Sequence, residues 1–384
     1  MMTRDKIEAL SDAQSSEWPT ISLYLRIDKE RIDDDYTIRL KNLLNQAAEQ
    51  VESNYSHDQR EAANSDIERI REFVRDEQDH YGRGLALFVN SRNDLFEAIE
   101  IPSDIESRVN IGPRTDVVPL IRLREQMEPF CTCLISRDQA RVFYGHMGKI
   151  EELSESRDDM VPGQHDQGGW SQARYERHIE EHVRAHFKET ASQLFDLAQQ
   201  RPFRLLVIGG PEEVVAGFVE TLHPYVRERH VGSIRILPEA NINDVHRESC
   251  DVINRWLDHE KQRMIDALRN QAPSGELRAT GVAATIEALQ RGQIMTLIVD
   301  GSFEHAGAIC QQCGSLQIPS DSSTNECVYC GGDLRQVDNI VPDIVLGAFR
   351  QGARVVFLNS PDHQQQAAEF GAIGAMLRFN VESE

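Results

Sequence analysis

Residues 161–181 read VPGQHDQGGWSQARYERHIEE, and they join a glycine-containing loop to a long helical pattern. Over residues 171–200 apolar side chains recur at helical spacing, which predicts one helix with a buried stripe. The stripe begins with Tyr175, Ile179, Val183 and Phe187. Gly168 and Gly169 stand just before this helix, so the tip of the loop can approach another backbone closely. Trp170 follows them; an exposed indole there favours stacking on a base, and the alternative is an indole folded back onto the domain.

The elements on either side of this loop predict an α/β protein with three domains. The first, residues 1–116, opens on the alternating run TISLYLRI, and NIGPRTD (110–116) is interpreted as the connector that ends it. The central domain, residues 117–242, alternates strand-like with helical runs, which is typical of an α/β layer with parallel pairing. The third, residues 243–384, shows the same alternation and closes on GAIGAMLRF.

Four of the seven cysteines form two pairs in the third domain, each followed by a glycine: Cys310 with Cys313, and Cys327 with Cys330. Two thiolates two residues apart can bind one metal from a tight turn, and the glycine permits the backbone conformation of that turn. Four sulfurs form a closed tetrahedral site, which is structural rather than catalytic. The pattern predicts a zinc ribbon inserted at about residues 308–334; two disulfides or redox-active pairs are the alternatives.

The composition is that of a globular protein, with 40% hydrophobic and 27% charged residues. A net charge of −22 excludes a broad basic surface for non-specific binding to free DNA, although it permits a local basic site. No apolar run approaches the ~18–20 residues that span a bilayer, and the polar N-terminus lacks the apolar region of a secretory signal. We therefore expect a cytoplasmic protein that makes no membrane contact.

The stretch 161–181 resembles the catalytic-loop region of the class-1 peptide release factors of archaea and eukaryotes, which read approximately VPGKH, a short basic link, GGQ and SARRFERLIEE. TISLYLRI and RGLALFVN resemble the first-domain strands of that superfamily, and LLVIGGP resembles a strand and turn of its central domain. The cysteine insert and GAIGAMLRF resemble its third domain, whose archaeal members keep a zinc ribbon. The likeness covers nearly the whole chain in the same order. The superfamily also includes Pelota-like proteins. The likeness is strongest to its bacterial branch, which includes peptidyl-tRNA hydrolases of ribosome-associated quality control and the hibernation factor Balon.

This resemblance implies a three-domain, release-factor-like architecture and a ribosomal function. The implied activity is codon-independent hydrolysis of peptidyl-tRNA; the alternative is a non-catalytic hibernation factor that occupies the ribosomal A site. The implied partners are the peptidyl-transferase region of the large ribosomal subunit and tRNA, with a translational GTPase as a candidate further partner. Zinc is the expected cofactor, in a structural role.

Two departures from the family change what the resemblance implies. In the family a glutamine follows the two glycines and is implied to position water against the ester, but here Trp170 occupies that place and the nearest glutamine is Gln172. An indole has one donor and no acceptor, whereas the amide of Gln172 has both. The Asn-Ile-Lys-Ser signature that reads stop codons is also absent, because DKERIDDDYTIRLKNLL follows TISLYLRI. We therefore expect no codon-dependent termination.

The candidate site residues follow from these comparisons and fall into three groups. For catalysis we assign Gln172, with Gly168 and Gly169 as the backbone that enters the site. The predicted RNA contacts are Trp170, Ser171, Arg174, Arg177 and His178. The predicted metal ligands are Cys310, Cys313, Cys327 and Cys330.

Overall fold

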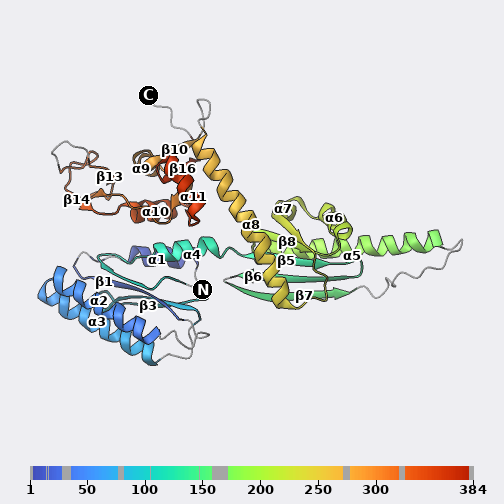
Figure 1. Ribbon diagram of the computed structural model, residues 1–384, viewed down its shortest axis with the longest axis horizontal. Coiled ribbons are helices and arrows are strands. Elements are labelled where there is room, and N and C mark those ends of the chain that lie inside the picture. The colour runs from blue at the N-terminus through green and yellow to red at the C-terminus, as the bar shows by residue number, and fades with distance from the viewer. Residues whose placement is uncertain are drawn as a thin grey trace. The chain divides into compact units, whose positions relative to one another are not determined.

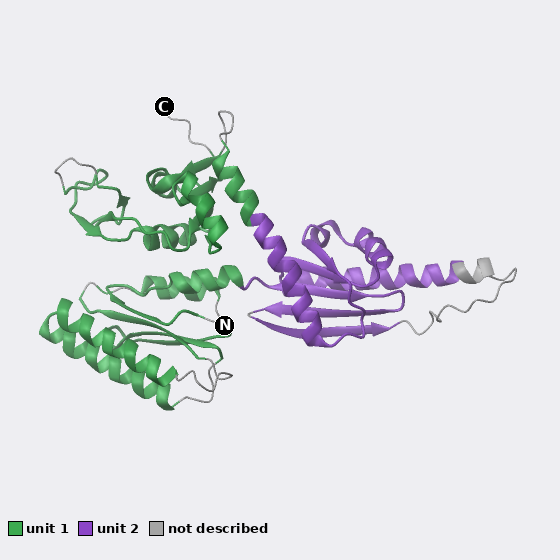
Figure 2. Ribbon diagram, viewed as in Figure 1, with its two compact units in different colours: residues 1–126, 261–384 green, residues 127–260 purple. Residues whose placement is uncertain are grey.

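The computed structural model describes residues 3–13, 15, 17–27, 36–76, 82–103, 105–146, 148–157, 172–270, 277–319 and 325–379, and at 172–176 it describes the backbone alone. Figure 2 shows the chain divided into two compact units. The first unit comprises residues 1–126 and 261–384, and the second comprises residues 127–260. The division into three domains stays a prediction.

A five-stranded mixed sheet with the order β7-β6-β5-β8-β9 forms the centre of the second unit (Figure 1). The middle strand β5 is parallel to β8, which is parallel to β9, while β6 and β7 are antiparallel additions on the other side. The parallel pairing expected from the alternation of strands and helices is therefore confirmed for half of this sheet. The strands are β5 (Phe130–Ile135), β6 (Gln139–His146), β7 (Lys149–Arg157), β8 (Leu205–Gly209) and β9 (His230–Ile234).

Both faces of this sheet are covered by helices. The helices of the unit are α5 (Gln172–Gln200), α6 (Glu212–Thr221), α7 (Pro224–Arg227) and the first part of α8 (Ile242–Arg269). Alternate residues of β5 point to opposite faces, as strand geometry requires. Cys131 and Cys133 share a core with α5, α6 and α7, whereas Phe130 and Leu134 share one with α8. On the α8 face, the buried hydroxyls of Thr132 and Ser249 lie 2.8 Å apart.

The turn between β8 and α6 requires glycine. Gly210 has a φ of 148°, and a Cβ at this position would lie 2.2 Å from the carbonyl oxygen of Ile135. Its amide donates to the carbonyl of Ile234 at 3.2 Å, which ties the turn to β9. The run GGP after this strand therefore serves as a strand-to-helix turn.

The first unit contains two four-stranded sheets and a smaller three-stranded sheet. The first of them is antiparallel, with the order β3-β2-β1-β4. It consists of β1 (Thr20–Arg26), β2 (Gly84–Asn90), β3 (Leu95–Ile101) and β4 (Arg108–Gly112). The helices α2 (Tyr36–Asn54) and α3 (His57–Asp76) cover one face and supply the buried residues Leu44 and Ile70. The first unit also contains the short helices α1 (Arg4–Asp12) and α4 (Val118–Gln126).

The second sheet of the first unit has the order β10-β16-β11-β15, with β11 and β15 parallel. Its strands are β10 (Arg278–Thr280), β11 (Ile294–Asp300), β15 (Arg354–Leu358) and β16 (Ile373–Leu377). The helices of this part are α9 (Gly281–Gln290), α10 (Val341–Arg350), α11 (Pro361–Ala367) and the last turns of α8. A small three-stranded sheet is inserted between β11 and α10, as the cysteine spacing predicted. It consists of β12 (Gly307–Cys310), β13 (Leu316–Gln317) and β14 (Leu334–Val337), and we call residues 307–337 the ribbon.

The connector expected at residues 110–116 differs from the structure. Its first residues belong to β4, an edge strand in which Ile111 pairs with Ile21 of β1. The turn-like letters Asn110, Gly112 and Pro113 suggested a loop, but pairing with an already formed sheet outweighs this local preference. No helix of the described residues is long and apolar enough to cross a membrane.

Candidate functional site

The loop that the sequence singles out connects β7 to α5. β7 is the edge strand of its sheet and ends at Arg157, and α5 begins at Gln172. The predicted site residues Gly168, Gly169, Trp170 and Ser171 lie between these elements, outside the described residues. The structure thus defines the two elements that bound the loop, and the roles of its residues stay predictions.

The helix α5 is anchored to the sheet through the predicted apolar stripe. Ile179 and Val183 are half-buried, and Phe187 is buried with 8% exposed. The stripe continues through Ala191, Leu194 and Ala198, which are all buried. The stripe is therefore confirmed from Ile179 to Ala198, whereas the side chain of Tyr175 lies outside the described part. Because the second half of the helix is the more deeply buried, its N-terminal turns are the part that projects from the core.

The predicted catalytic and RNA-binding residues of α5 lie in these N-terminal turns. Gln172 and Arg174 fall within the first turn, where the structure describes the backbone alone. Arg177 and His178 follow, and both side chains are exposed. Residues three and four apart are neighbours on a helix surface, so Arg174, Arg177 and His178 share one face. The exposed side chains of Arg177 and His178 are accessible to a phosphate group, while the roles of Gln172 and Arg174 stay predictions.

A row of imidazoles extends from this face along α5. The ring centroids of His178 and His182 lie 4.6 Å apart, one helical turn from each other. His186 continues the row at a position that is only 6% exposed. Its Nε2 atom has no hydrogen-bond partner among the described residues. The sequence analysis assigned a role to His178 alone, although the four-residue spacing of the three histidines was visible in the sequence.

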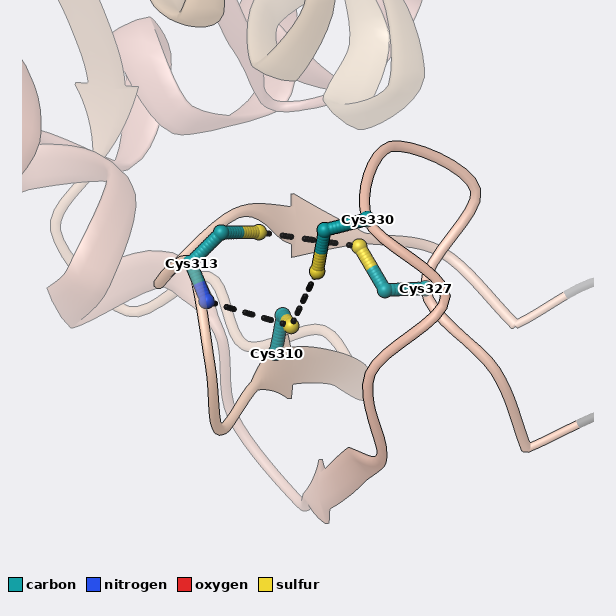
Figure 3. A group of neighbouring side chains, drawn as sticks. All are labelled: Cys310, Cys313, Cys327 and Cys330. Atoms are coloured by element: carbon teal, nitrogen blue, oxygen red, sulfur yellow. Dashed lines mark hydrogen bonds between the residues drawn. The ribbon is translucent and has the colours of Figure 1, made fainter.

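The four predicted metal ligands come together in the ribbon (Figure 3). The Sγ atoms of Cys310, Cys313, Cys327 and Cys330 all lie within 4.8 Å of one another. Cys310 and Cys330 approach to 3.5 Å between sulfurs, and Cys313 and Cys327 approach to 3.7 Å. All four are free thiols, so the structure does not contain the disulfides that were one alternative. A convergent tetra-thiol cluster of this kind can hold a metal ion.

Backbone amides point at two of these sulfurs. The amides of Gln312 and Cys313 donate to Cys310 Sγ at 3.4 Å, and the amide of Tyr329 donates to Cys327 Sγ at 3.4 Å. Each CxxC pair therefore forms a tight turn around its first sulfur. Hydrogen bonds of this type favour the thiolate, which is the form that binds metals.

Two side chains beside the cluster add to this effect. Ser315 Oγ lies 3.2 Å from Cys327 Sγ, and Gln317 Nε2 donates to the same sulfur at 3.0 Å. Burial raises the pKa of Cys327, but hydrogen bonds from Ser315 and the Tyr329 amide outweigh it and lower that pKa to about 5. Hydrogen bonding to Ser315 also lowers the pKa of Cys313. Ser315 and Gln317 were not found from the sequence, because only their closeness to the sulfurs in space gives them a role.

One glutamine connects the ribbon to the neighbouring helix. Gln290, at the end of α9, donates through Nε2 to the carbonyl of Leu316 in β13 at 2.6 Å. Its Oε1 accepts a hydrogen bond from the hydroxyl of Tyr329, which lies inside the second CxxC pair. Both amide atoms of Gln290 are therefore used to hold the ribbon on α9. The sequence gives no sign of this role, since Gln290 reads as an ordinary helix residue.

Comparison with known proteins identifies the relatives of the chain. Residues 116–253 match the model of bacterial archaeo-eukaryotic release factor family 10. This span contains β7, the loop and all of α5. The chain is similar to the proteins of the class-1 release-factor-like superfamily. Its curated relatives include peptide chain release factor subunit 1 of Pyrococcus abyssi, which is 24% identical over 333 residues, with 78% of this chain and 80% of the relative covered.

Further relatives and solved structures match over as much of the chain or more. Peptide chain release factor subunit 1 of Thermococcus sibiricus is 22% identical over 420 residues, covering 99% of this chain and 97% of the relative. Among solved structures, an archaeal aRF1 is 16% identical with a TM-score of 0.26 and 98% of each chain covered. Archaeoglobus fulgidus Pelota is 17% identical with a TM-score of 0.35, covering 78% of this chain and 80% of that one. The likeness to this superfamily therefore rests on the sequence matches.

Proposed function

We propose that this release-factor-like protein binds the large ribosomal subunit and hydrolyses peptidyl-tRNA without reading a codon. The observation that carries the proposal is the position of the GGWSQ loop. It connects the edge strand β7 to the exposed end of the long helix α5, inside the span that matches the release-factor family model. A loop held in this way can enter a narrow site while the sheet and the rest of α5 keep its base in place.

The chemistry that we assign to this loop needs no strong base. Hydrolysis of an ester requires a water in line with the carbonyl carbon and a donor where negative charge develops. The amide of Gln172 can accept from the water and donate to an oxygen, and Gly168 and Gly169 allow a close backbone approach. Trp170 then stacks on a base and fixes the register of the loop. The surrounding RNA excludes bulk solvent and supplies the remaining orientation.

The RNA contact is assigned to the exposed face of α5. Arg174, Arg177 and His178 donate to phosphates near the loop, and Ser171 contacts the same RNA. A local cationic face is compatible with the net charge of −22. Dissolved salt screens the acidic groups of the rest of the chain, so they act only weakly on this face beyond about 8 Å. The partners are thus the peptidyl-transferase region of the large subunit and tRNA, and a translational GTPase is a candidate for delivery.

For the ribbon we propose one structural zinc ion held by Cys310, Cys313, Cys327 and Cys330. The cluster fits the ion in donor set, number and convergence, since four thiolates form a closed tetrahedral site with no open position. The amide donors and Ser315 stabilise the required thiolates. Zinc binding then supplies folding free energy to the small ribbon and takes no part in ester hydrolysis.

A specific observation favours a second candidate function. Trp170 stands where the release factors carry their glutamine, and an indole cannot orient a water through an amide. The alternative is therefore a hibernation factor that occupies the A site with Trp170 as a stacking plug and hydrolyses nothing. In that case Gln172 has no catalytic role.

Two measurements test both functions. The first is release of labelled peptide from peptidyl-tRNA on purified large subunits, and the second is co-sedimentation of the protein with those subunits. Hydrolysis predicts release well above background at protein concentrations that saturate binding. Tight binding without release would replace the enzyme proposal by the hibernation proposal. Absence of both binding and release would contradict both.

A further inference from the structure

A short run of the second unit carries a tyrosine together with two arginines, two histidines and one glutamate. Residues 223–230 read HPYVRERH and include the short helix α7. They lie between α6 and β9, and the proposed function gives them no role. In a chain with a net charge of −22, two arginines and two histidines within eight residues form a local exception. The contacts of Tyr225, Arg229 and His223 indicate which kind of ligand this run can bind.

The ring of Tyr225 rests on a fixed guanidinium group. Arg229 Cζ lies 4.1 Å from the centroid of the Tyr225 ring and 5.4 Å from that of Phe203. Arg229 also donates to the carbonyl of Phe203, whose side chain is only 2% exposed. The guanidinium is therefore held between a core ring and a surface ring. Tyr225 stays 41% exposed, so its ring is both fixed in place and open to a partner.

His223 stands beside this ring and presents a donor. Its Nδ1 accepts from the amide of Tyr225 at 3.2 Å, which assigns the proton of the neutral imidazole to Nε2. The imidazole packs against Phe195 of α5 with centroids 4.5 Å apart, and Phe195 lies 6.3 Å from Tyr225. His223 is exposed, so it offers an N–H donor next to the open ring.

Arg227 adds a second donor group to the same run of sequence. Its partner Glu220 is 3.7 Å away, and their side chains are 46% and 79% exposed. Such an exposed pair contributes little to stability, so the guanidinium can exchange this partner at low cost. The surface therefore combines one preorganised aromatic ring with two donor groups within five residues of sequence.

We propose that Tyr225 is a stacking platform for an unpaired base of large-subunit ribosomal RNA, with His223 and Arg227 donating to the adjacent phosphate. The inference rests on the proposed function, because it takes the large subunit as the partner. Stacking suits an exposed ring whose other face is already occupied by a cation, and a held ring loses little freedom on binding. The donor groups match a phosphate that follows the stacked base. An acidic protein segment is the competing partner, and the test separates it.

The full-length protein should be compared as wild type, Tyr225→Phe and Tyr225→Leu for binding to purified large subunits. Leucine keeps apolar bulk but removes the π face, so Tyr225→Leu should bind about 5- to 150-fold more weakly. Tyr225→Phe keeps the face and should bind as wild type does. The Tyr225→Leu variant should leave the salt dependence of binding unchanged, whereas Arg227→Gln should reduce it, because only the second change removes a phosphate contact. Ultraviolet cross-linking should join the peptide that contains Tyr225 to ribosomal RNA.

Two results would overturn the inference alone. One is a wild type that binds large subunits while Tyr225→Leu binds equally well. The other is a cross-link from this peptide to a ribosomal protein in place of RNA, which would identify the surface as a protein-docking site. A wild type that does not bind large subunits would remove the proposed function and this inference with it, so the two failures are distinguishable.

Discussion

Phe187 on α5 and Phe218 on α6 pack edge to face, with ring centroids 5.5 Å apart and planes at 75°. Phe218 is fully buried, and Phe187 is 8% exposed. Leu194, two turns further along α5, belongs to the same core and is also fully buried. This contact joins the helix that carries the predicted RNA-binding face to the core of its unit. The orientation of that face therefore depends on packing well away from the loop.

Phe218→Ala should destabilise the second unit by about 3–5 kcal/mol, because it removes a fully buried ring and leaves a cavity. Denaturant unfolding measures the change, and hydrogen exchange in α5 should rise with it. Glu213→Ala is the matched control, since Glu213 lies on the exposed face of α6 and its loss should cost less than about 0.5 kcal/mol. A Phe218→Ala protein with wild-type stability would show that this contact does not anchor α5.

The purified protein should contain one zinc per chain under reducing conditions. Cys313→Ser should release the metal and unfold the ribbon locally, because the ribbon has only a small core of its own. Cys250→Ser is the matched control: Cys250 lies on α8, away from the cluster, and its loss should leave the metal content unchanged. Metal analysis that finds less than about a tenth of an equivalent in the wild type would refute the zinc assignment.

Gln290→Ala should loosen the ribbon without emptying its metal site. The change removes the hydrogen bonds to Leu316 and Tyr329 that hold the ribbon on α9, and it leaves all four sulfurs in place. Each lost hydrogen bond is worth about 1 kcal/mol, so hydrogen exchange in residues 307–319 should increase several-fold. Gln311→Ala, an exposed change on the ribbon itself, should have no effect. Unchanged exchange in the Gln290→Ala protein would mean that other contacts hold the ribbon.

Replacing Arg174 and Arg177 together by glutamate should weaken binding to large subunits and reduce the salt dependence of the affinity. The reason is that each phosphate contact releases counterions, and each lost contact lowers the salt slope by about 0.7–0.9. Arg71→Glu provides the control, because Arg71 is an exposed residue of α3 in the first unit that pairs with Glu68. Equal affinities at several salt concentrations would place the ribosomal contact elsewhere.

Much of the fold was predictable because its signals are local. The alternation in TISLYLRI predicted strand β1, and the four-residue spacing of apolar residues after residue 171 predicted helix α5. The spacing of the two CxxC pairs predicted the ribbon. The edge strand β4 was missed because its pairing with β1 is formed by residues far apart in sequence. The parallel pairing expected from alternating strands and helices describes β5, β8 and β9, whereas β6 and β7 follow tight turns and are antiparallel.

The candidate site was predictable to a different degree in each part. The spacing of the four cysteines identifies them in the sequence, and their sulfur atoms converge as predicted. Gln290, Ser315 and Gln317 could not be predicted, because each acts through a partner that only the folded chain brings near. Tyr225 and Arg229 stand in a run with visible aromatic and basic letters, but only the stacking of Arg229 on the rings of Phe203 and Tyr225 distinguishes them from an ordinary exposed turn.

The maximal rate of peptide release by Gln172→Ala tests the central proposal most directly. The rate should be measured on purified large subunits carrying labelled peptidyl-tRNA, at protein concentrations that saturate binding, beside wild type and Trp170→Ala. If Gln172 orients the attacking water, Gln172→Ala should lower the maximal rate on the order of 100-fold with binding retained. Trp170→Ala should instead raise the concentration needed for half-maximal release, because it removes a stacking contact worth about 1–3 kcal/mol. Release by Gln172→Ala at the wild-type rate would contradict the assignment of that residue, and a wild type that binds tightly but releases nothing would contradict hydrolysis itself.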